Sequence, residues 1–238
     1  MDDAKSSDGN IRLYVIGDIH GRLDLLDRLI VAIDRDVEEH GPQAITITLG
    51  DYIDRGPDSR GVLDRLMANP FPTPYVALKG NHEALLAAFL ADPAVGTQWR
   101  MLGGLETLHS YGVPVSSLAF SKNYEEAAAR LRVAMPPTHL GFLQSLKSWY
   151  SYGKYFFCHA GVRPGVPLDR QSDEDLFWIR DEFLRSKIDF GKIVVHGHTP
   201  TPEPEVLPNR INIDTGAFVT GKLTCIVLEG DQHRFIFT

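Results

Sequence analysis

The sequence predicts an α/β fold in which largely parallel strands alternate with helices that cover the faces of a sheet. Three features of the N-terminal part of the chain predict it. Short apolar runs rich in β-branched residues indicate buried strands, and each run ends in a polar loop that contains glycine. Each loop is followed by apolar residues at helical spacing. This strand–loop–helix order repeats, which favours parallel strands with both faces covered.

Length and composition indicate a single domain in a reducing compartment. The 238 residues suit one domain, which we expect to span 11–238 behind a disordered tail at 1–10. The formal charge of −7 disfavours nucleic acid and anionic membranes as partners. The longest apolar run, Ala84 to Ala91, is far shorter than the roughly 20 residues of a membrane helix. Cys158 and Cys225 each lie in a predicted strand, which indicates buried free thiols and a cytoplasmic protein.

The first two strands end in glycine-flanked polar loops. The first strand is expected over Ile11–Ile16 and is followed by Gly17-Asp18-Ile19-His20-Gly21. Apolar residues at helical spacing then predict a helix that ends near Gly41-Pro42. The second strand, Ile45–Leu49, runs into the heptapeptide Gly50-Asp51-Tyr52-Ile53-Asp54-Arg55-Gly56, whose flanking glycines allow a sharp turn.

The third strand repeats the pattern. Asp58 or Ser59 can cap the helix that precedes it. The strand itself, Tyr75–Leu78, ends in Gly80-Asn81-His82-Glu83 and leads into a helix over Ala84–Leu90.

The middle of the chain, 92–150, breaks this order. Helical periodicity around 124–135 and 140–149 predicts a helical insertion that covers one rim of the site, as a lid would.

The C-terminal part returns to strands. Tyr155–Cys158 and Ile193–Val195 are predicted to be buried strands, followed by His159-Ala160-Gly161 and His196-Gly197-His198-Thr199. A helix over 173–185 is expected between them. Further short strands are predicted to form a hairpin-rich second sheet, at 211–213, 222–228 and 234–237, after an extended segment at 200–208.

Five strand ends carry side chains that bind metals. In an extended segment, residues i and i+2 project to the same side, so Asp18 and His20 can grip one cation together. Carboxylate, imidazole and amide donors suit Mn, Fe or Zn and are too rich in nitrogen for calcium. They suffice for two ions that share a carboxylate, an arrangement suited to hydrolysing phosphate esters. The residues are Asp18, His20, Asp51, Asn81, His82, His159 and His198.

Each of these residues also has an ordinary structural explanation. Asp18 can cap the following helix, and Asn81 can form a turn. A single histidine at a strand end often has only a structural role. Their coincidence at five successive strand ends favours one shared site.

Five segments of the chain resemble the signature blocks of calcineurin-like metallophosphoesterases. Within that superfamily they are similar to the bacterial and phage members of the phosphoprotein phosphatase branch. The resemblance implies a four-layer sandwich, two mixed β-sheets flanked by helices, with a helical insertion near the active site. The segments are 17–21, 50–56, 80–83, 159–161 and 196–199, and 213–217 resembles a later block of the bacterial type.

The resemblance also implies a role for each site residue. His82 would be the general acid, with Asp54 orienting its imidazole and raising its pKa. Arg55 would hold phosphate oxygens through its planar fork. The implied metal ligands are Asp18 and His20 for the first ion, Asp51 as the bridge, and Asn81, His159 and His198 for the second ion.

Two further residues are less firmly tied to the blocks. Arg180 resembles a second phosphate-binding arginine of the phage and bacterial enzymes, and the alternative is a surface arginine paired with Glu174 or Asp175. His196 is expected to be a packed strand-end residue, because His198 is the position that matches the family ligand.

The implied activity is that of a dinuclear-metal phosphomonoesterase. The first expectation is a protein serine/threonine phosphatase, with or without activity on phosphotyrosine, whose substrate is a phosphoprotein or another phosphorylated molecule. A hydroxide bridging two divalent ions, with manganese expected first, would attack phosphorus directly. The alternative is a bis(5'-nucleosyl)-tetraphosphatase, although that family typically has Asp where this chain has Glu83. A metal-free interaction module would be expected to lack some ligands, and here all are present.

Overall fold

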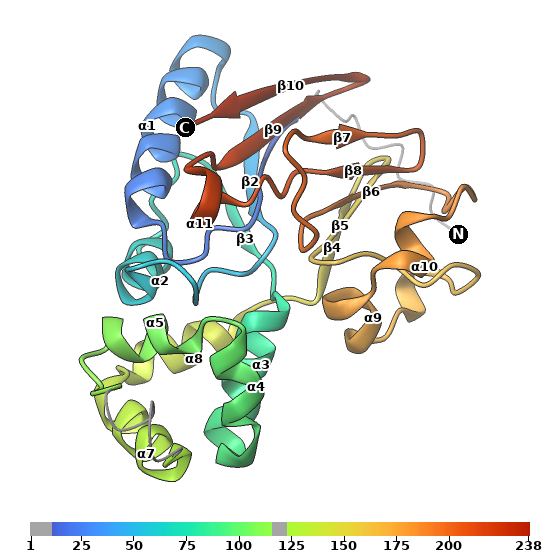
Figure 1. Ribbon diagram of the computed structural model, residues 1–238. Coiled ribbons are helices and arrows are strands. Elements are labelled where there is room, and N and C mark those ends of the chain that lie inside the picture. Colours follow the sequence, from blue (N-terminus) through green and yellow to red (C-terminus); the bar gives the residue numbers. More distant parts are fainter. Residues whose placement is uncertain (1–10, 116–122) are drawn as a thin grey trace, which may run out of the picture.

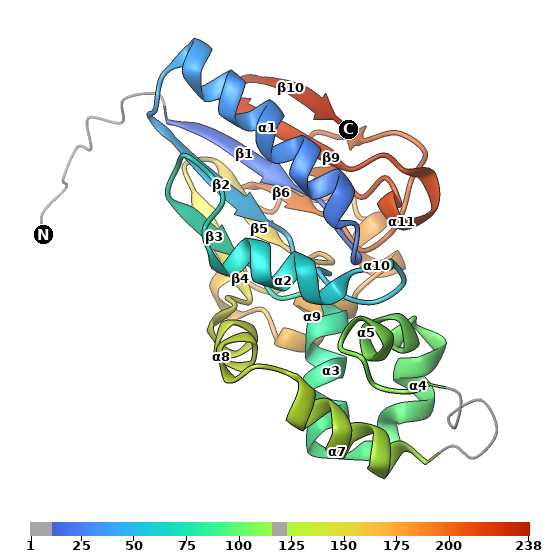
Figure 2. The ribbon, with the colours of Figure 1, turned by 90° about the vertical axis from the view of Figure 1, so that its left-hand side faces the viewer.

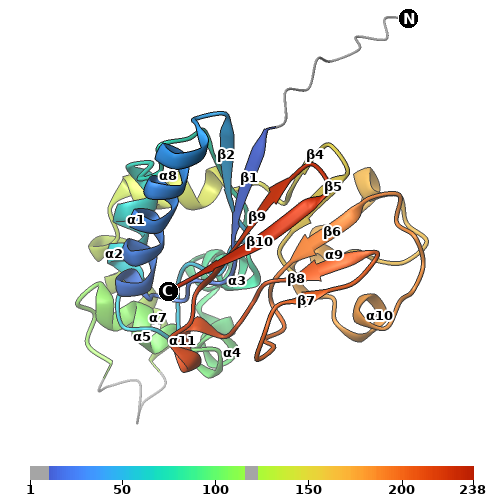
Figure 3. The ribbon, with the colours of Figure 1, turned by 90° about the horizontal axis from the view of Figure 1, so that it is seen from above.

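Two five-stranded sheets pack face to face, and helices cover the outer face of each (Figure 3). This computed structural model describes residues 11–115 and 123–238, so the tail expected at 1–10 lies outside the described residues. The resulting order of layers, helix–sheet–sheet–helix, is the predicted four-layer sandwich. Within the described residues, no helix is both long and apolar enough to cross a membrane.

The first sheet has the strand order β10–β9–β1–β2–β3 and is mixed. The pairs β1–β2 and β2–β3 are parallel, whereas β9 runs antiparallel to β1 and to β10. Helices α1 (Leu23–His40) and α2 (Ser59–Met67) cover its outer face (Figure 1). The strands are β1 (Arg12–Ile16), β2 (Ala44–Thr48), β3 (Tyr75–Ala77), β9 (Thr224–Glu229) and β10 (Gln232–Phe237).

The second sheet has the order β4–β5–β6–β8–β7 and is also mixed. Its middle strands β5, β6 and β8 are parallel, and the two edge strands are antiparallel to them. The helices on its side are η2 (Leu168–Arg170, a 3-10 helix), α9 (Asp173–Trp178) and α10 (Asp181–Leu184). The strands are β4 (Trp149–Tyr152), β5 (Tyr155–Cys158), β6 (Ile193–His196), β7 (Glu205–Val206) and β8 (Arg210–Asn212).

Alternation along the strands builds the core. In β1, Val15 faces the second sheet, and its neighbour Ile16 packs with the α1 and α2 side chains. In β5, Phe157 joins the layer between the sheets and Phe156 packs under α9 and α10. Every second residue therefore changes layer, as the two-residue repeat of a strand requires. This packing fixes the register of the strands, and with it the position of each loop that follows a strand.

The described residues of the segment 92–150, as far as Ser145, form a separate group of helices below the two sheets (Figures 1 and 2). It packs against α3 (Asn81–Ala91), and Trp99 and Leu131 are buried in its interior. Its described helices are η1 (Pro93–Val95, a 3-10 helix), α4 (Gly96–Met101), α5 (Gly104–Ser110), α7 (Tyr124–Ala134) and α8 (Pro137–Ser145).

Two predicted helices were wrong in extent. The helix expected at 140–149 ends at Ser145, and Trp149 begins β4, where it pairs with Cys158 and stacks on Phe156. The helix expected at 173–185 is broken, because Ile179 takes an extended ψ of 142°. Burial of Ile179 on that kinked path therefore separates α9 from α10.

The predicted hairpin-rich second sheet was also wrong. The β9–β10 hairpin belongs to the first sheet, where β9 lies beside β1. Ile226 faces the second sheet and Val227 faces the helix layer, so β9 is an interior strand buried on both sides. The remaining predicted strand, at 211–213, falls within and just beyond β8 of the second sheet.

Candidate active site

Parallel strands of the two sheets bring the predicted ligands together at the carboxyl ends of the strands. The loops after β1, β2 and β3 meet the loops after β5 and β6, since the carboxyl ends of parallel strands point the same way. All six predicted metal ligands are buried, with between 0% and 6% of each residue exposed. They are Asp18, His20, Asp51, Asn81, His159 and His198.

The backbone of the site is strained at several of the predicted site residues. Within the described residues, six non-glycine residues have positive φ, and five of them are predicted site residues. Such conformations cost free energy and persist only where the surroundings hold them, so they concentrate at functional sites. The five are His20, Asp51, Asp54, Arg55 and His198, and the sixth is Asn69.

Asp51 lies between two groups of ligand atoms. Its Oδ2 is 3.4 Å from His20 Nε2, and its Oδ1 is 3.4 Å from His159 Nε2. The groups with metal-ligand spacing are His20, Asp51 and His82 on one side and Asp51, His159 and His198 on the other. Asp51 is the residue shared by both, which is the arrangement of a bridging carboxylate.

The second group converges on one point. Asn81 Oδ1 lies 2.8 Å from His159 Nε2 and 2.8 Å from His198 Nδ1, and the two histidine atoms are 3.2 Å apart. His159 Nδ1 donates to the carbonyl of Leu49 at 3.0 Å, because a carbonyl can only accept. The lone pair of a neutral His159 is therefore on Nε2 and points at the other two atoms, as in a metal site with an outer-shell acceptor.

The first group is oriented in the same way. His20 Nδ1 donates to the carbonyl of Ile53 at 2.9 Å, which turns Nε2 toward Asp51. Asp18 Oδ2 accepts from the backbone N–H of His198 at 3.0 Å, while its buried Oδ1 has no hydrogen-bond partner. A Cβ on Gly197 would lie 2.1 Å from that oxygen, so only glycine permits the approach.

The environment keeps two of the imidazoles neutral. Burial lowers the pKa of His20 to about 3 and that of His198 to about 2, so each offers a lone pair at neutral pH. Burial also acts to lower the pKa of His159, but Asp51 and Asp18 outweigh it and raise that pKa to about 9. In the absence of metal, a proton on His159 supplies positive charge next to these carboxylates. A bound divalent cation would supply that positive charge instead.

The carboxylates respond to burial and to each other. Burial raises the pKa of Asp18, and the nearby Asp214 raises it further. Asp51 is equally buried, yet His159 and His82 hold its pKa well below the ordinary value. Buried carboxylates of this kind are normally paired or bound to a metal.

His82 and Asp54 form a buried pair beside the ligands. His82 Nδ1 donates to Asp54 Oδ2 at 2.7 Å, and His82 Nε2 is buried without a partner, 3.7 Å from Asp51 Oδ2. Burial lowers the pKa of His82, but Asp51 and Asp54 outweigh it and the pKa is raised. A protonated Nε2 facing the reaction centre is the arrangement a general acid needs.

The Arg55 guanidinium packs on the aromatic ring of Phe218, a residue that the sequence did not predict to be part of the site. Its guanidinium carbon is 4.7 Å from the centre of the Phe218 ring, and the same ring meets the His20 ring edge to face at 5.3 Å. The pair lines a surface pocket of about 620 Å³. The Asp54 side chain therefore points inward to His82, and the neighbouring Arg55 side chain points outward to the pocket.

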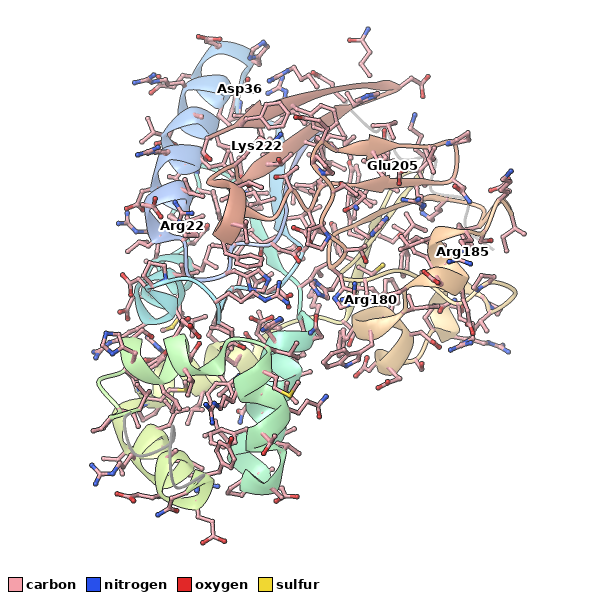
Figure 4. All side chains as sticks on the ribbon, viewed as in Figure 1. Arg22, Asp36, Arg180, Arg185, Glu205 and Lys222 are labelled. Carbon is pink, nitrogen blue, oxygen red and sulfur yellow. The ribbon has the colours of Figure 1, made fainter. Side chains whose placement is uncertain are left out.

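Arg180 is exposed and lies at the edge of the site (Figure 4). Its Nη1 donates to Thr199 Oγ1 at 3.5 Å, next to His198. The alternative pairing with Asp175 is taken by another residue, because Arg163 Nη2 lies 2.6 Å from Asp175.

His196 is packed away from the ligand groups. Its Nε2 lies 3.4 Å from Arg210 Nη1, and its ring meets the Phe183 ring edge to face at 4.9 Å.

Glu83 has a structural role that sequence reasoning missed. Its carboxylate accepts from the backbone N–H groups of Asp51 (2.9 Å), Tyr52 (2.8 Å) and Gly80 (2.9 Å). One side chain therefore ties the loop after β2 to the start of α3. The signal was present, since Glu three residues after Gly80 is the spacing of a capping box.

The site fits divalent metal ions. Asp18 Oδ1, His82 Nε2 and His198 Nε2 are three of the buried side-chain atoms that lack a hydrogen-bond partner in the described part of the chain. An unpaired buried polar atom is costly, and three of them on predicted site residues indicate a bound group. Neutral imidazoles, carboxylates and an amide oxygen are donors that Mn, Fe and Zn accept.

The chain belongs to the calcineurin-like phosphoesterase family, whose profile matches residues 11–235. Its members hydrolyse phosphate esters at a dinuclear metal centre, and this chain is a phosphoester hydrolase of that class.

Two kinds of curated relative are similar to it. A bis(5'-nucleosyl)-tetraphosphatase, PrpE, of Anoxybacillus flavithermus is 26% identical over 89% of this chain and 88% of the relative. Serine/threonine-protein phosphatase 2 of Escherichia coli is 28% identical over 89% of this chain and 90% of the relative.

Solved structures of similar shape support the fold. One, provisionally named a diadenosine tetraphosphatase, is 19% identical with a TM-score of 0.65, covering 97% of this chain and 95% of its own. A cold-active protein-tyrosine phosphatase of a psychrophilic Shewanella species is 14% identical with a TM-score of 0.55, over 95% of this chain and 80% of its own.

Proposed function

We propose that this protein is a dinuclear-metal phosphomonoesterase that removes phosphate from phosphoserine and phosphothreonine in proteins. The observation that carries the proposal is Asp51, shared by two groups of ligand atoms, with the His82–Asp54 pair beside it. Asp18, His20 and Asp51 would hold one ion and Asp51, Asn81, His159 and His198 the other. Manganese is the metal we propose, and the same donors accept Fe or Zn.

The residues divide the work of phosphoryl transfer. When bound, the two ions supply an activated water and neutralise charge on the phosphate. Arg55 holds two phosphate oxygens through its fork, and the Phe218 ring keeps the guanidinium from swinging into solvent. His82 gives the proton on Nε2 to the departing oxygen, and Asp54 stabilises the imidazolium. Arg180 would make a further phosphate contact at the rim.

Charge around Arg55 supports a monoester as substrate. The pocket beside it is lined by Asp24, Asp27 and Asp58 as well as by Arg22. Arg22 is already paired with Asp24 through two hydrogen bonds of 2.8 Å. A polyphosphate chain would therefore meet no excess of positive charge along this pocket.

The second candidate is the asymmetric hydrolysis of bis(5'-nucleosyl) tetraphosphates. It is favoured by the PrpE relative, which matches almost the whole chain at 26% identity. The metal ligands and the acid would serve both reactions, so the candidates differ in what binds outside the metal centre.

The two cysteines support a cytoplasmic location. We place the protein in the cytoplasm because Cys158 and Cys225 are both free and buried in their strands.

One comparison tests the substrate. Purified protein with Mn²⁺ is offered a phosphoserine peptide, a phosphotyrosine peptide and diadenosine tetraphosphate, and kcat/KM is measured for each. We expect the phosphoserine peptide to have the highest value. A higher kcat/KM for the tetraphosphate would replace our proposal with the second candidate.

A further inference from the structure

The carboxylate of Asp54 is held by side chains from the insertion at 92–150. Trp99 Nε1, in α4, donates to Oδ2 at 2.9 Å, and the Thr107 hydroxyl, in α5, donates to Oδ1 at 2.5 Å. Asp54 and Thr107 are fully buried and Trp99 is 1% exposed. Since water does not reach this carboxylate, the donors around it decide how it points.

Thr107 also holds the backbone of Asp54. The Asp54 N–H donates to Thr107 Oγ1 and to Ser59 Oγ, both at 3.0 Å, and the two hydroxyl oxygens are 2.9 Å apart. The backbone of Asp54 has a φ of 70°, which a non-glycine residue keeps only when its surroundings hold it. Thr107 therefore fixes both the backbone and the side chain of Asp54.

The turn between α4 and α5 packs directly on Arg55 as well. The Arg55 N–H donates to the carbonyl of Gly103 at 3.1 Å. A Cβ on Gly103 would lie 2.7 Å from Arg55 N, and the φ of 101° at Gly103 also favours glycine. The insertion thus contacts the two residues of the heptapeptide that face the acid and the substrate.

We propose that Trp99 and Thr107 are positioning residues for proton transfer, so that α4 and α5 form a fixed wall of the active site. The proposal rests on the proposed function, in which His82 is the general acid. In that step the attacking water oxygen forms a bond to phosphorus, the bond from phosphorus to the leaving oxygen breaks, and His82 Nε2 gives its proton to that oxygen. Asp54 remains ionised and keeps accepting from His82 Nδ1, while Trp99 and Thr107 keep their protons.

The role predicts a dependence on the leaving group. p-Nitrophenolate is a weak base and departs without a proton, whereas phenolate is more basic and depends more on the acid. A misplaced Asp54 should therefore slow phenyl phosphate much more than p-nitrophenyl phosphate. General damage to the fold or to metal binding should slow both substrates alike.

The experiment compares Trp99→Phe and Thr107→Val with the wild type on these two substrates in Mn²⁺. We expect kcat/KM for phenyl phosphate to fall about tenfold or more, since each variant removes a hydrogen bond to a charged group. For p-nitrophenyl phosphate we expect a loss of about twofold or less. Thr107→Ser keeps the hydroxyl and should retain the wild-type ratio between the substrates. Bound manganese should be unchanged in all variants.

Tyr111→Phe is the matched control. Tyr111 is also buried in the insertion, where its hydroxyl lies 2.5 Å from His139 Nδ1, and that hydrogen bond does not involve Asp54. This variant should keep the wild-type ratio even if it is less stable. Equal losses on both substrates in Trp99→Phe and Thr107→Val, or no loss, would overturn the positioning role. A wild-type protein that hydrolyses neither substrate would overturn the proposed function itself.

Discussion

Asp51 is the residue on which the site depends most. It follows β2 through Gly50, and its φ of 53° turns the carboxylate between the His20 and His159 rings. A Cβ on Gly80 would lie 2.1 Å from Asp51 Oδ1, so the loop after β3 must pass close by without a side chain. The strained backbone and the required glycine both serve to bring one carboxylate to two groups of ligands.

Asp51→Asn should abolish metal-dependent hydrolysis. The amide keeps the shape but removes the negative charge that the two proposed ions would share, so we expect the rate on p-nitrophenyl phosphate to fall by about 10³-fold or more. Metal analysis of the purified variant should show fewer bound ions than the wild type. Asp231→Asn, which alters an exposed carboxylate near Lys154, serves as the control. An Asp51→Asn variant with more than a tenth of wild-type activity would contradict the bridging role.

Glu83 supports Asp51 from outside the metal centre. It accepts hydrogen bonds from four backbone N–H groups of two loops, and burial together with Asp51 raises its pKa to about 7. A buried carboxyl is kept here because the N–H groups it accepts would otherwise lose their partner.

Glu83→Gln should be destabilising by about 1–3 kcal/mol, because the amide NH₂ faces backbone donors where an oxygen accepted before. Urea unfolding of the metal-free protein measures this. Glu83→Asp is one methylene shorter and should lose part of the same contacts. Its free energy of unfolding should therefore lie between those of Glu83→Gln and the wild type. Equal unfolding free energies for Glu83→Gln and the wild type would show that the clamp contributes nothing.

At the scale of elements, α1 is attached to the first sheet by a polar contact at its far end. Asp36 Oδ1 accepts from the Tyr14 hydroxyl in β1 at 2.5 Å and from Arg234 Nη2 in β10 at 2.6 Å. Burial acts to raise the pKa of Asp36, but Arg234 and Tyr14 outweigh it and the pKa is lowered from 3.8.

Asp36→Asn should therefore cost stability in a pH-dependent way. The folded pKa lies below the unfolded one, so the stabilisation is present above the unfolded pKa and is lost as the pH falls through the folded pKa. We expect a loss of about 1 kcal/mol at pH 7, since the Arg234 side is partly exposed and screened. Urea unfolding at pH 7 and at pH 3 should show the difference between variant and wild type shrinking on acidification. A difference that grows at low pH would contradict this account.

The sequence predicted elements best where packing follows a simple period. β1 and the C-terminal end of α1 were predicted to within a residue or two, because their apolar residues repeat at strand or helical spacing. The break at Ile179 was not predictable, since Leu176, Ile179 and Phe183 keep helical spacing across it. β4 was not predicted, because its four residues form a strand through pairing with β5 and not through a pattern of their own.

At the scale of the whole molecule, the site is assembled from both sheets and the insertion. The metal-type residues could be predicted because they stand in short motifs at strand ends. Trp99, Thr107 and Phe218 could not, since each is far in sequence from the residue it contacts and belongs to no pattern. Only folding brings Asp54 to Trp99 and Arg55 to Phe218.

Metal binding should stabilise the whole chain. Ligands that bind only the folded state add free energy by mass action, about 2.7 kcal/mol at one hundred times the dissociation constant. For a chain of this size that corresponds to a rise in Tm of roughly 5–10 °C. Thermal unfolding with and without Mn²⁺ measures it, and Asp51→Asn should lose most of the shift. An unchanged Tm in saturating Mn²⁺ would contradict metal binding.

The central claim is that two metal ions share Asp51. Anomalous X-ray diffraction from Mn²⁺-soaked crystals tests it most directly, because it locates each ion without reference to activity. We predict two anomalous peaks, one beside His20 and Asp18 and the other beside Asn81, His159 and His198, with the Asp51 carboxylate between them. A single peak, or two peaks that do not both contact Asp51, would contradict the account.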